Sequence, residues 1–311
     1  MVNFPIDFVV PYVNNFDQVW RKTYTDYCLQ HNMKGRIDAI DKERYRDFGY
    51  LIFLFRGIAQ NMPFIRKVFL IVSNPEQVPD WVNQEKVQVV LHKDIIPSQY
   101  LPTFNSTTIE MFIPDIKGLS EHFIYGNDDI YTINPTTAED YFTDDGRVKI
   151  KMDPYIKMPS DKQYWKVCYK NCIEIVTKLD KELHPEGAFH VPSHSLTPIT
   201  KTNAIKARKL LRQELFDSIS NFRTDENFNQ YIYTHYAYYT DDYADSERIV
   251  EYVDMGRKNT NNILIPLEQK RVQELIINDT ETTDKSYWRH YNQIITKAFL
   301  KKFPEKCKYE K

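Results

Sequence analysis

Cysteine, glycine and long apolar runs are all scarce in this sequence. Its 311 residues include four cysteines and eight glycines. No apolar run approaches the ~18 residues that span a bilayer. The N-terminal MVNFPIDFVV lacks the basic start of a signal peptide. We therefore expect a protein of the reducing cytoplasm, with no disulfide framework.

An excess of basic charge is also missing. Lysine and arginine number 41 against 43 acidic residues, which gives a formal net charge of −2. This balance excludes the basic footprint of a nucleic-acid-binding protein. The C-terminal KKFPEKCKYEK holds five lysines against two glutamates. It predicts a solvated terminus, and peripheral contact with the anionic inner face of a membrane is the alternative.

Short apolar runs rich in β-branched residues alternate with helical periodicity in the first half of the chain. The runs predict buried strands at 6–13, 67–73, 87–91 and 122–125. Helices are expected at 20–31, over about 14 residues from near Asp47, and at 107–112. This order predicts an α/β fold with a mostly parallel, Rossmann-like sheet. We expect this α/β core to occupy residues 1–150.

Helical periodicity dominates after residue 151, so a mainly helical part is expected over 151–311. The expected helices are 165–183, 201–216, 226–239, 266–277 and 285–303. Residues 184–200, rich in histidine and proline, read as a long irregular loop of the functional kind. Cys168 and Cys172 lie four apart on one predicted helix. Without histidines at ligand spacing, they are interpreted as core thiols and not as a metal pair.

Acidic residues follow the predicted strand 122–125 directly. Asn127, Asp128 and Asp129 stand at its carboxyl end, where ligands bind in open α/β sheets. Adjacent carboxylates repel one another, and Mg²⁺ accepts one or two of them while it keeps positions for phosphate oxygens. The pattern therefore predicts a Mg²⁺ or Mn²⁺ site at Asp128 and Asp129. An ordinary turn rich in Asn and Asp is the alternative.

Two further segments carry polar residues at predicted helix starts. In LPTFNS, Asn105 and the two residues after it are N-cap candidates, and Glu110 completes a capping box with Thr107. The N–H groups of such a helix start would suit a phosphate. Arg46 and Asp47 fall at the start of another predicted helix, where surface charge with a capping aspartate is the alternative.

Several segments together resemble one family. They are IDFVVPYVNNFDQVWRK near the N-terminus; RYRD, HKDIIP, YLPTFNS, GLSEHFIY and NDD in that order; HVPSHSLTPITK; and FRTDENFNQYIYTHY with the closing NDT and FPEK. They are similar to the Stealth proteins, the bacterial capsular and exopolysaccharide sugar-phosphate transferases. The animal lysosomal-enzyme N-acetylglucosamine-1-phosphotransferase belongs to the same family. The first segment departs at Asn14, where the family usually has aspartate.

The resemblance implies transfer of a sugar 1-phosphate from a UDP-sugar to a hydroxyl of an oligosaccharide or lipid-linked glycan, with release of UMP. A metal-dependent glycosyltransferase that releases UDP and an inactive glycan-binding module are the alternatives. The implied base is His194, with His190 as its alternative. The remaining implied site residues are Arg223, Asp129 and Asp47 for catalysis, and Asp7, Arg46, Asn105 and Asn127 for the donor.

Overall fold

The computed structural model describes residues 1–31, 45–157, 164–176, 188–255, 261–279 and 285–311. Its strands are β1 (Ile6–Pro11), β2 (Ile65–Val72), β3 (Val87–Leu91), β4 (His122–Tyr125), β5 (Ile130–Thr132), β6 (Val148–Ile150), β7 (Met152–Lys157), β8 (Ala188–Pro192), β9 (Thr197–Thr200), β10 (Tyr243–Asp245), β11 (Val250–Asp254) and β12 (Glu274–Asn278). Its helices are α1 (Gln18–His31), α2 (Leu51–Asn61), α3 (His92–Ile95), α4 (Ser106–Phe112), α5 (Tyr164–Val176), α6 (Lys201–Leu210), α7 (Arg212–Asp217), α8 (Tyr231–Tyr239), α9 (Asn261–Glu268) and α10 (Lys285–Lys302).

A five-stranded sheet in the order β3-β2-β1-β4-β9 forms the centre of the molecule. The four strands from the first half are parallel, and β9 joins the edge antiparallel to β4. All four parallel strands lie at or close to the apolar runs that predicted them, because a parallel sheet buries both faces of its strands. The predicted α/β class with a mostly parallel sheet is confirmed.

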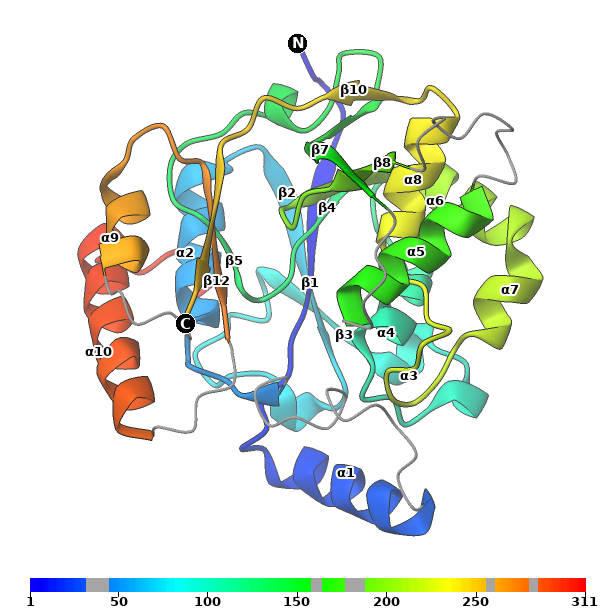
Figure 1. The fold of residues 1–311 in the computed structure, drawn as a ribbon. Helices are drawn as coiled ribbons and strands as arrows, with labels where there is room; N and C mark the ends of the chain where they lie inside the picture. Colours follow the sequence, from blue (N-terminus) through cyan, green and yellow to red (C-terminus); the bar gives the residue numbers. More distant parts are fainter. Residues whose placement is uncertain (32–44, 158–163, 177–187, 256–260, 280–284) are drawn as a thin grey trace.

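Helices cover both faces of this sheet. Successive residues of β1 alternate between the faces. Phe8 and Val10 enter a core shared with α2 and α10, and Val9 enters a second core shared with α4, α5 and α8. Figure 1 shows α2 and α10 on one side of the sheet and α4, α5, α6 and α8 on the other. Cys168 and Cys172 are both buried, as predicted, and Cys172 belongs to the second core.

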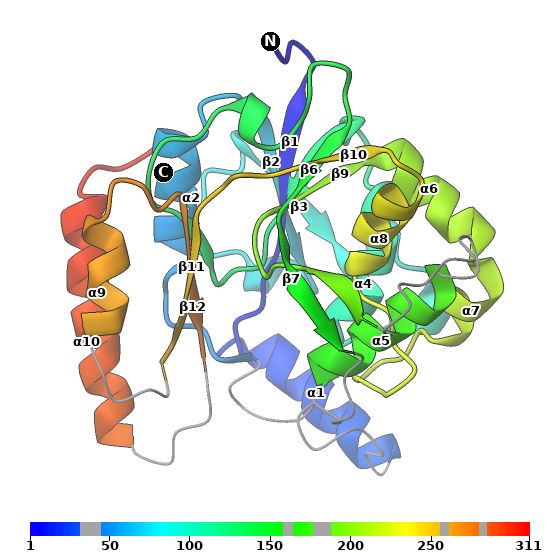
Figure 2. The ribbon, with the colours of Figure 1, turned by 45° about the horizontal axis from the view of Figure 1, so that its top comes forward.

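A second sheet, in the order β11-β12-β5, is reached directly from the first. The chain leaves β4, turns through residues 126–129 and enters β5, which pairs antiparallel with β12. Figure 2 shows β11 and β12 between the central sheet and the α9–α10 pair. The turn after β4 is therefore the junction of two sheets.

The second half of the chain also supplies strands, which corrects two expectations. The predicted helix 266–277 is wrong, since α9 ends at Glu268 and β12 begins at Glu274. The run Leu275–Ile277 pairs with β5 and β11, and this tertiary pairing overrides helical periodicity. The expected irregular loop contains β8 and β9 from residue 188 onward; residues 184–187 lie outside the described part.

Helix α2 begins four residues later than predicted. Gly49 adopts a positive φ of +78°, a conformation suited to glycine, and Leu51 starts the helix. The carboxylate of Asp47 accepts a hydrogen bond from the Gly49 N–H at 2.8 Å. Arg46 and Asp47 consequently lie in a loop before the helix and not in its first turn.

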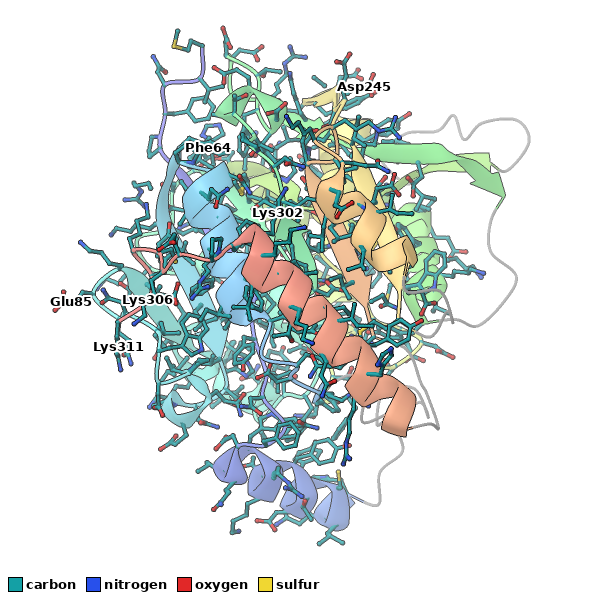
Figure 3. All side chains as sticks on the ribbon, turned by 90° about the vertical axis from the view of Figure 1, so that its left-hand side faces the viewer. Phe64, Glu85, Asp245, Lys302, Lys306 and Lys311 are labelled. Carbon is teal, nitrogen blue, oxygen red and sulfur yellow. The ribbon has the colours of Figure 1, made fainter. Side chains whose placement is uncertain are left out.

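The C-terminal segment packs against the rest of the protein, whereas all of its lysines except Lys302 are exposed. Tyr309 and Glu310 are buried, and Glu310 forms a bidentate ion pair with Arg56 of α2. Backbone hydrogen bonds link this segment to residues 81–83. Figure 3 shows Lys306 and Lys311 at the same edge as Glu85. Across the described ranges, no helix has both the length and the apolar character that crossing a membrane requires.

Candidate active site

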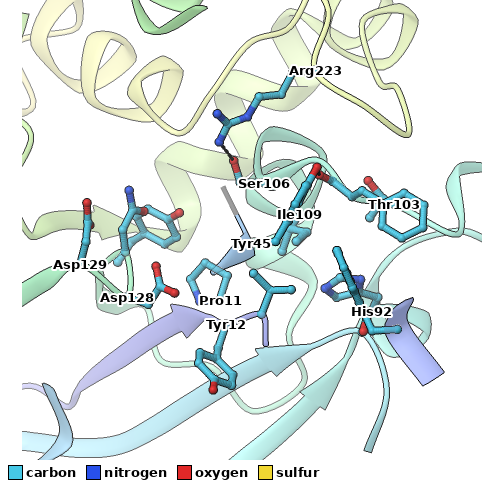
Figure 4. A pocket seen from close by; sticks show the side chains of 16 residues that line it. Pro11, Tyr12, Tyr45, His92, Thr103, Ser106, Ile109, Asp128, Asp129 and Arg223 are labelled. Atoms are coloured by element: carbon cyan, nitrogen blue, oxygen red, sulfur yellow. Dashed lines mark hydrogen bonds between the residues drawn. The ribbon is translucent and has the colours of Figure 1, made fainter. Parts of the chain in front are cut away.

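A cavity of about 160 Å³ opens at the carboxyl ends of all four parallel strands. Each strand supplies wall residues: Tyr12 after β1, Ser73 after β2, His92 after β3 and Asn127, Asp128 and Asp129 after β4. The strand order 3-2-1-4 places the switch in crossover direction between β1 and β4, where open α/β sheets bind ligands. In Figure 4 the two aspartates lie on one side of the cavity, His92 and Thr103 on the other, and Arg223 above.

The acidic turn is held by the backbone of both sheets. The Gly126 N–H donates to the carbonyl of Val9 at 3.0 Å, and the Ile277 N–H donates to the carbonyl of Asp129 at 3.0 Å. Gly126 has no room for a side chain: a Cβ there would lie 2.6 Å from Leu196 and 2.8 Å from Phe8. The turn therefore requires glycine because of close approach.

Three carboxylates share this end of the sheet. Asp128 is an exposed residue at the cavity, but the protein around its carboxylate removes part of the hydration of that group. Burial raises its pKa to about 7, and the charges of Asp129 and Asp47 add to that rise. Asp47 does not line the cavity; it accepts a hydrogen bond from the Tyr12 hydroxyl at 2.7 Å. Concentrated negative charge is thus a property of the site.

The chemistry of the turn suits a divalent cation. The Oδ1 atom of Asp129 is buried without a hydrogen-bond partner, a state that is costly for a carboxylate. In the described ranges, no three His, Cys, Asp or Glu side chains form a ready-made metal cage. Mg²⁺ does not need one, since it binds through one or two carboxylates and completes its shell with water and phosphate oxygens.

His194 contacts the cavity through Asp129. Its Nε2 donates to Asp129 Oδ2 at 3.3 Å, and its side chain is 31% exposed. Burial alone would lower the pKa of His194, but the charge of Asp129 and the hydrogen bond to it outweigh burial, with help from Glu110 and Glu274, so the pKa is raised. The side chain of His190, in β8, lies outside what the structure describes.

Arg223 closes the opposite wall. Its guanidinium donates to Ser106 Oγ at 3.1 Å and lies 4.7 Å from the centre of the Tyr164 ring. These contacts present a cation to the cavity from the segment just before α8. Of the residues predicted from sequence, Arg223, Asn127, Asp128 and Asp129 line the cavity.

Three expected donor ligands are engaged elsewhere. Asp7 is fully buried at the other end of β1, where it binds Arg66 and the Ser120 N–H. Arg46 forms a bidentate pair with Asp279 at 2.9 and 2.8 Å. Asn105 is buried beneath the wall.

Asn105, one of the three predicted candidates, is the N-cap of α4, but the predicted capping box with Glu110 does not form. Asn105 Oδ1 accepts from the Thr107 N–H at 3.1 Å, and its amide donates to Asn227. Glu110 makes no capping box. It is buried between the Tyr125 hydroxyl and the Gln230 N–H, and burial raises its pKa. The tertiary partners, over 100 residues away in the case of Asn227 and Gln230, decide the role of both side chains.

Sequence reasoning missed His92 as a wall residue. It is 8% exposed, and burial lowers its pKa to about 4, so the ring is neutral. Within the described ranges its ring has no hydrogen-bond partner. The signal was its place directly after the predicted strand 87–91, the same rule that identified the acidic turn.

Residues 44–150 match the family description "Stealth protein CR2, conserved region 2". The chain is 40% identical over 148 residues to an exopolysaccharide phosphotransferase, cps2G, of Lactiplantibacillus plantarum; the match covers 47% of this chain and 42% of that protein. It is 27% identical to a capsular polysaccharide phosphotransferase of Neisseria meningitidis serogroup B, over 96% of this chain and 83% of that protein. It is also similar to a solved galactosyltransferase, LgtC, with a TM-score of 0.44 and 9% identity over 94% of this chain and 95% of that one.

We predict that Asp128→Asn raises the melting temperature at pH 8 in EDTA, by at least about 2 °C. The folded protein holds the Asp128 proton up to about pH 7, whereas the unfolded chain releases it near the ordinary value of 3.8. Stability therefore falls between these values as pH rises, and the variant escapes that loss. At pH 4 the two proteins are expected to melt together. Asp80→Asn, at an exposed position, is the control; an equal shift at both pH values contradicts the electrostatic origin.

Proposed function

This chain is a relative of the Stealth proteins and carries their conserved region 2, and we propose that it transfers a sugar 1-phosphate from a UDP-sugar to a hydroxyl of a glycan acceptor. The proposed setting is capsular or exopolysaccharide synthesis. One observation carries the proposal: the cavity at the carboxyl ends of the parallel strands brings together the acidic turn and Arg223, and His194 is hydrogen-bonded to Asp129 of that turn. Phosphoryl transfer requires mainly positioning and neutralisation of charge.

The donor is proposed to bind against the wall between α1 and the LPTFNS loop. An adjoining cavity of about 340 Å³ shares Trp20, His92 and Phe104 with the first. Aromatic walls with a neutral, unpartnered imidazole suit a planar heterocyclic base, which offers both stacking and hydrogen-bonding edges. The pyrophosphate would then lie between Arg223 and the acidic turn, since a guanidinium binds phosphate oxygens in a fork.

The divalent cation is proposed to lie on Asp128 and Asp129. When bound, it supplies neutralisation of charge on the pyrophosphate and on the leaving UMP. Asp128 and Asp129 would hold the cation, and Asp47, which lies outside the cavity on the Tyr12 hydroxyl, adds negative charge. Arg223 stabilises the transferring phosphoryl group from the other wall.

Localisation at the inner face of the membrane is a separate proposal, and it rests on the lysine-rich C-terminal segment.

His194 is the proposed base on the acceptor side. With Nε2 donating to Asp129, Nδ1 carries the lone pair that accepts the proton of the acceptor hydroxyl. The hydroxyl oxygen bonds to the phosphorus next to the sugar. The bond from that phosphorus to the bridging oxygen breaks, and UMP leaves with the oxygen. Tyr252 lies beside the His194 ring and is 52% exposed, so it offers an open aromatic face to a sugar.

The released nucleotide tests this function. Incubation with a panel of UDP-sugars and a capsule-type oligosaccharide is expected to yield UMP and a phosphodiester-linked sugar. Release of UDP would identify a glycosyltransferase that uses the same cavity. Tight binding of glycan without nucleotide release would identify a binding module.

We predict dependence on Mg²⁺ or Mn²⁺. Excess EDTA is expected to remove turnover and either cation to restore it, because the paired carboxylates cannot approach a pyrophosphate uncompensated. Asp129→Asn is expected to lose most activity while its circular dichroism stays native. Unchanged turnover in EDTA would show that Arg223 alone neutralises the phosphates.

We predict that Arg223→Lys reduces kcat/KM at least ten-fold, about 1.4 kcal/mol of transition-state stabilisation. Lysine keeps the charge but loses the planar fork and the stacking on Tyr164. Arg212→Lys, at an exposed position, is the matched control and is expected to be neutral. Wild-type kinetics in Arg223→Lys would mean that only the charge matters at this position.

We predict that His194→Ala reduces transfer by roughly 10² to 10⁴-fold while donor affinity changes little. Titration of UDP-sugar binding alongside turnover measures both halves. His190→Ala is the parallel variant, and His290→Ala, at an exposed position, is the control. Equal loss of binding and turnover would make His194 a donor ligand, and no loss of either would leave it without a role in the reaction.

A further inference from the structure

We propose that Arg248 and Glu274 are positioning residues: their buried ion pair holds the backbone of Leu196 and thereby positions His194 against Asp129. This inference deepens the proposed function and rests on the role of His194 as the base. Neither residue lines the cavity, and neither lies within residues 44–150 that match the Stealth region.

Two directional hydrogen bonds fix the backbone of Leu196, one to its N–H and one to its carbonyl. The Leu196 N–H donates to Glu274 Oε2 at 2.9 Å, and Arg248 donates to the Leu196 carbonyl at 3.0 Å. Arg248 also donates to Glu274 Oε1, so the three groups form a closed set. The side chains are 1% and 0% exposed. Tyr141 covers them, with its hydroxyl on Glu274 and its ring 4.3 Å from the guanidinium.

The acidic turn fixes the same residue from the other side. A Cβ atom on Gly126 would lie only 2.6 Å from Cδ2 of Leu196, so the Leu196 side chain packs directly against the turn. Leu196 is therefore held between the ion pair and the turn, with its backbone and its side chain fixed separately. His194 is two residues before it, and Asp129 is three residues after Gly126. Small shifts of Leu196 therefore change the contact between His194 and Asp129.

Glu274 is also connected to the acidic turn through the backbone of β12. It lies on β12 opposite Thr132 of β5, the strand that follows Asp129 directly. One buried carboxylate is thus bound to the histidine segment by its side chain and to the strand of the acidic turn by its backbone. This arrangement ties the two segments that carry His194 and Asp129 to one residue.

Stability alone does not account for a buried ion pair. Removing two charges from water costs several kcal/mol per ion, and well-packed apolar residues of similar volume often serve stability as well or better. Apolar side chains cannot, however, bind both the N–H and the carbonyl of one residue, as this pair does at Leu196. The charged groups that face His194 are Asp129, Glu110 and Glu274. Because Arg248 contacts Glu274 and offsets its negative charge, the pair affects the position of the His194 ring more than its protonation.

The test replaces the pair with apolar residues, Arg248→Met with Glu274→Leu. We expect kcat to fall about 10- to 100-fold, the effect of misplacing a catalytic group by up to an ångström, with donor KM within about two-fold of wild type. In the His194→Ala background the same change is expected to have no further effect on kcat, because it acts through the missing ring. Additive losses would overturn the proposal.

A matched control exists in the same chain. Arg56 and Glu310 form another buried ion pair, in this case bidentate, between α2 and the C-terminal segment; neither residue lines the cavity, and their side chains are 10% and 3% exposed. Arg56→Met with Glu310→Leu is expected to leave kcat unchanged. If the Arg248 and Glu274 double variant fails to fold, Arg248→Lys keeps the charge but lacks the guanidinium fork, and it is expected to lower kcat by the same route.

The NMR signal of the His194 ring Cε1–H separates this proposal from the proposed function. It is expected to move in the Arg248 and Glu274 double variant and to stay in the Arg56 and Glu310 control. A signal that does not move, in a folded double variant, overturns the positioning role. A signal that moves without any change in turnover confirms the positioning and removes His194 from the proposed reaction.

Discussion

Repulsion among carboxylates at the junction of two sheets is the constraint around which this structure is built. Asp128 and Asp129 stand together on the turn from β4 to β5, with Asp47 close enough to raise the pKa of Asp128. Such a group is stable only where the surrounding backbone is fixed. Here β1 binds the turn through Gly126 and β12 binds it through Asp129, so each sheet contributes one anchor.

Local signals made the first half of the fold predictable. The predicted bounds of the strands at 87–91 and 122–125 are the observed ones. Each strand is a short apolar run between turn residues, and this signal depends only on residues adjacent in sequence. The strand Glu274–Asn278 was mistaken for helix, since only its pairing with β11 and with β5, the latter more than 140 residues earlier, distinguishes the two. Gly49 displaced the start of α2 for a similar reason: one backbone conformation overrode a periodic pattern.

The candidate site was predictable where residue type and strand end suffice. Asp128 and Asp129 follow a strand, and their neighbours in sequence are their neighbours in space. Asp7, Asn105 and Arg46 are polar residues of the expected kind, but partners 59, 122 and 233 residues away engage them. Sequence shows that such a residue is unusual, whereas only the fold shows whether its partner is a ligand or another side chain.

Asp129, in the first half of the chain, is hydrogen-bonded to His194, in the second half. Its Oδ2 accepts from His194, and its Oδ1 is buried without a partner. A cation proposed at Oδ1 and a base held at Oδ2 would share one carboxylate, so binding on the donor side and orientation on the acceptor side would depend on the same torsion angles. A rotation of Asp129 that improves one contact disturbs the other. This coupling explains why the turn is held so tightly: the site needs one fixed carboxylate, and the glycine, the second sheet and the buried ion pair each remove a way for it to move.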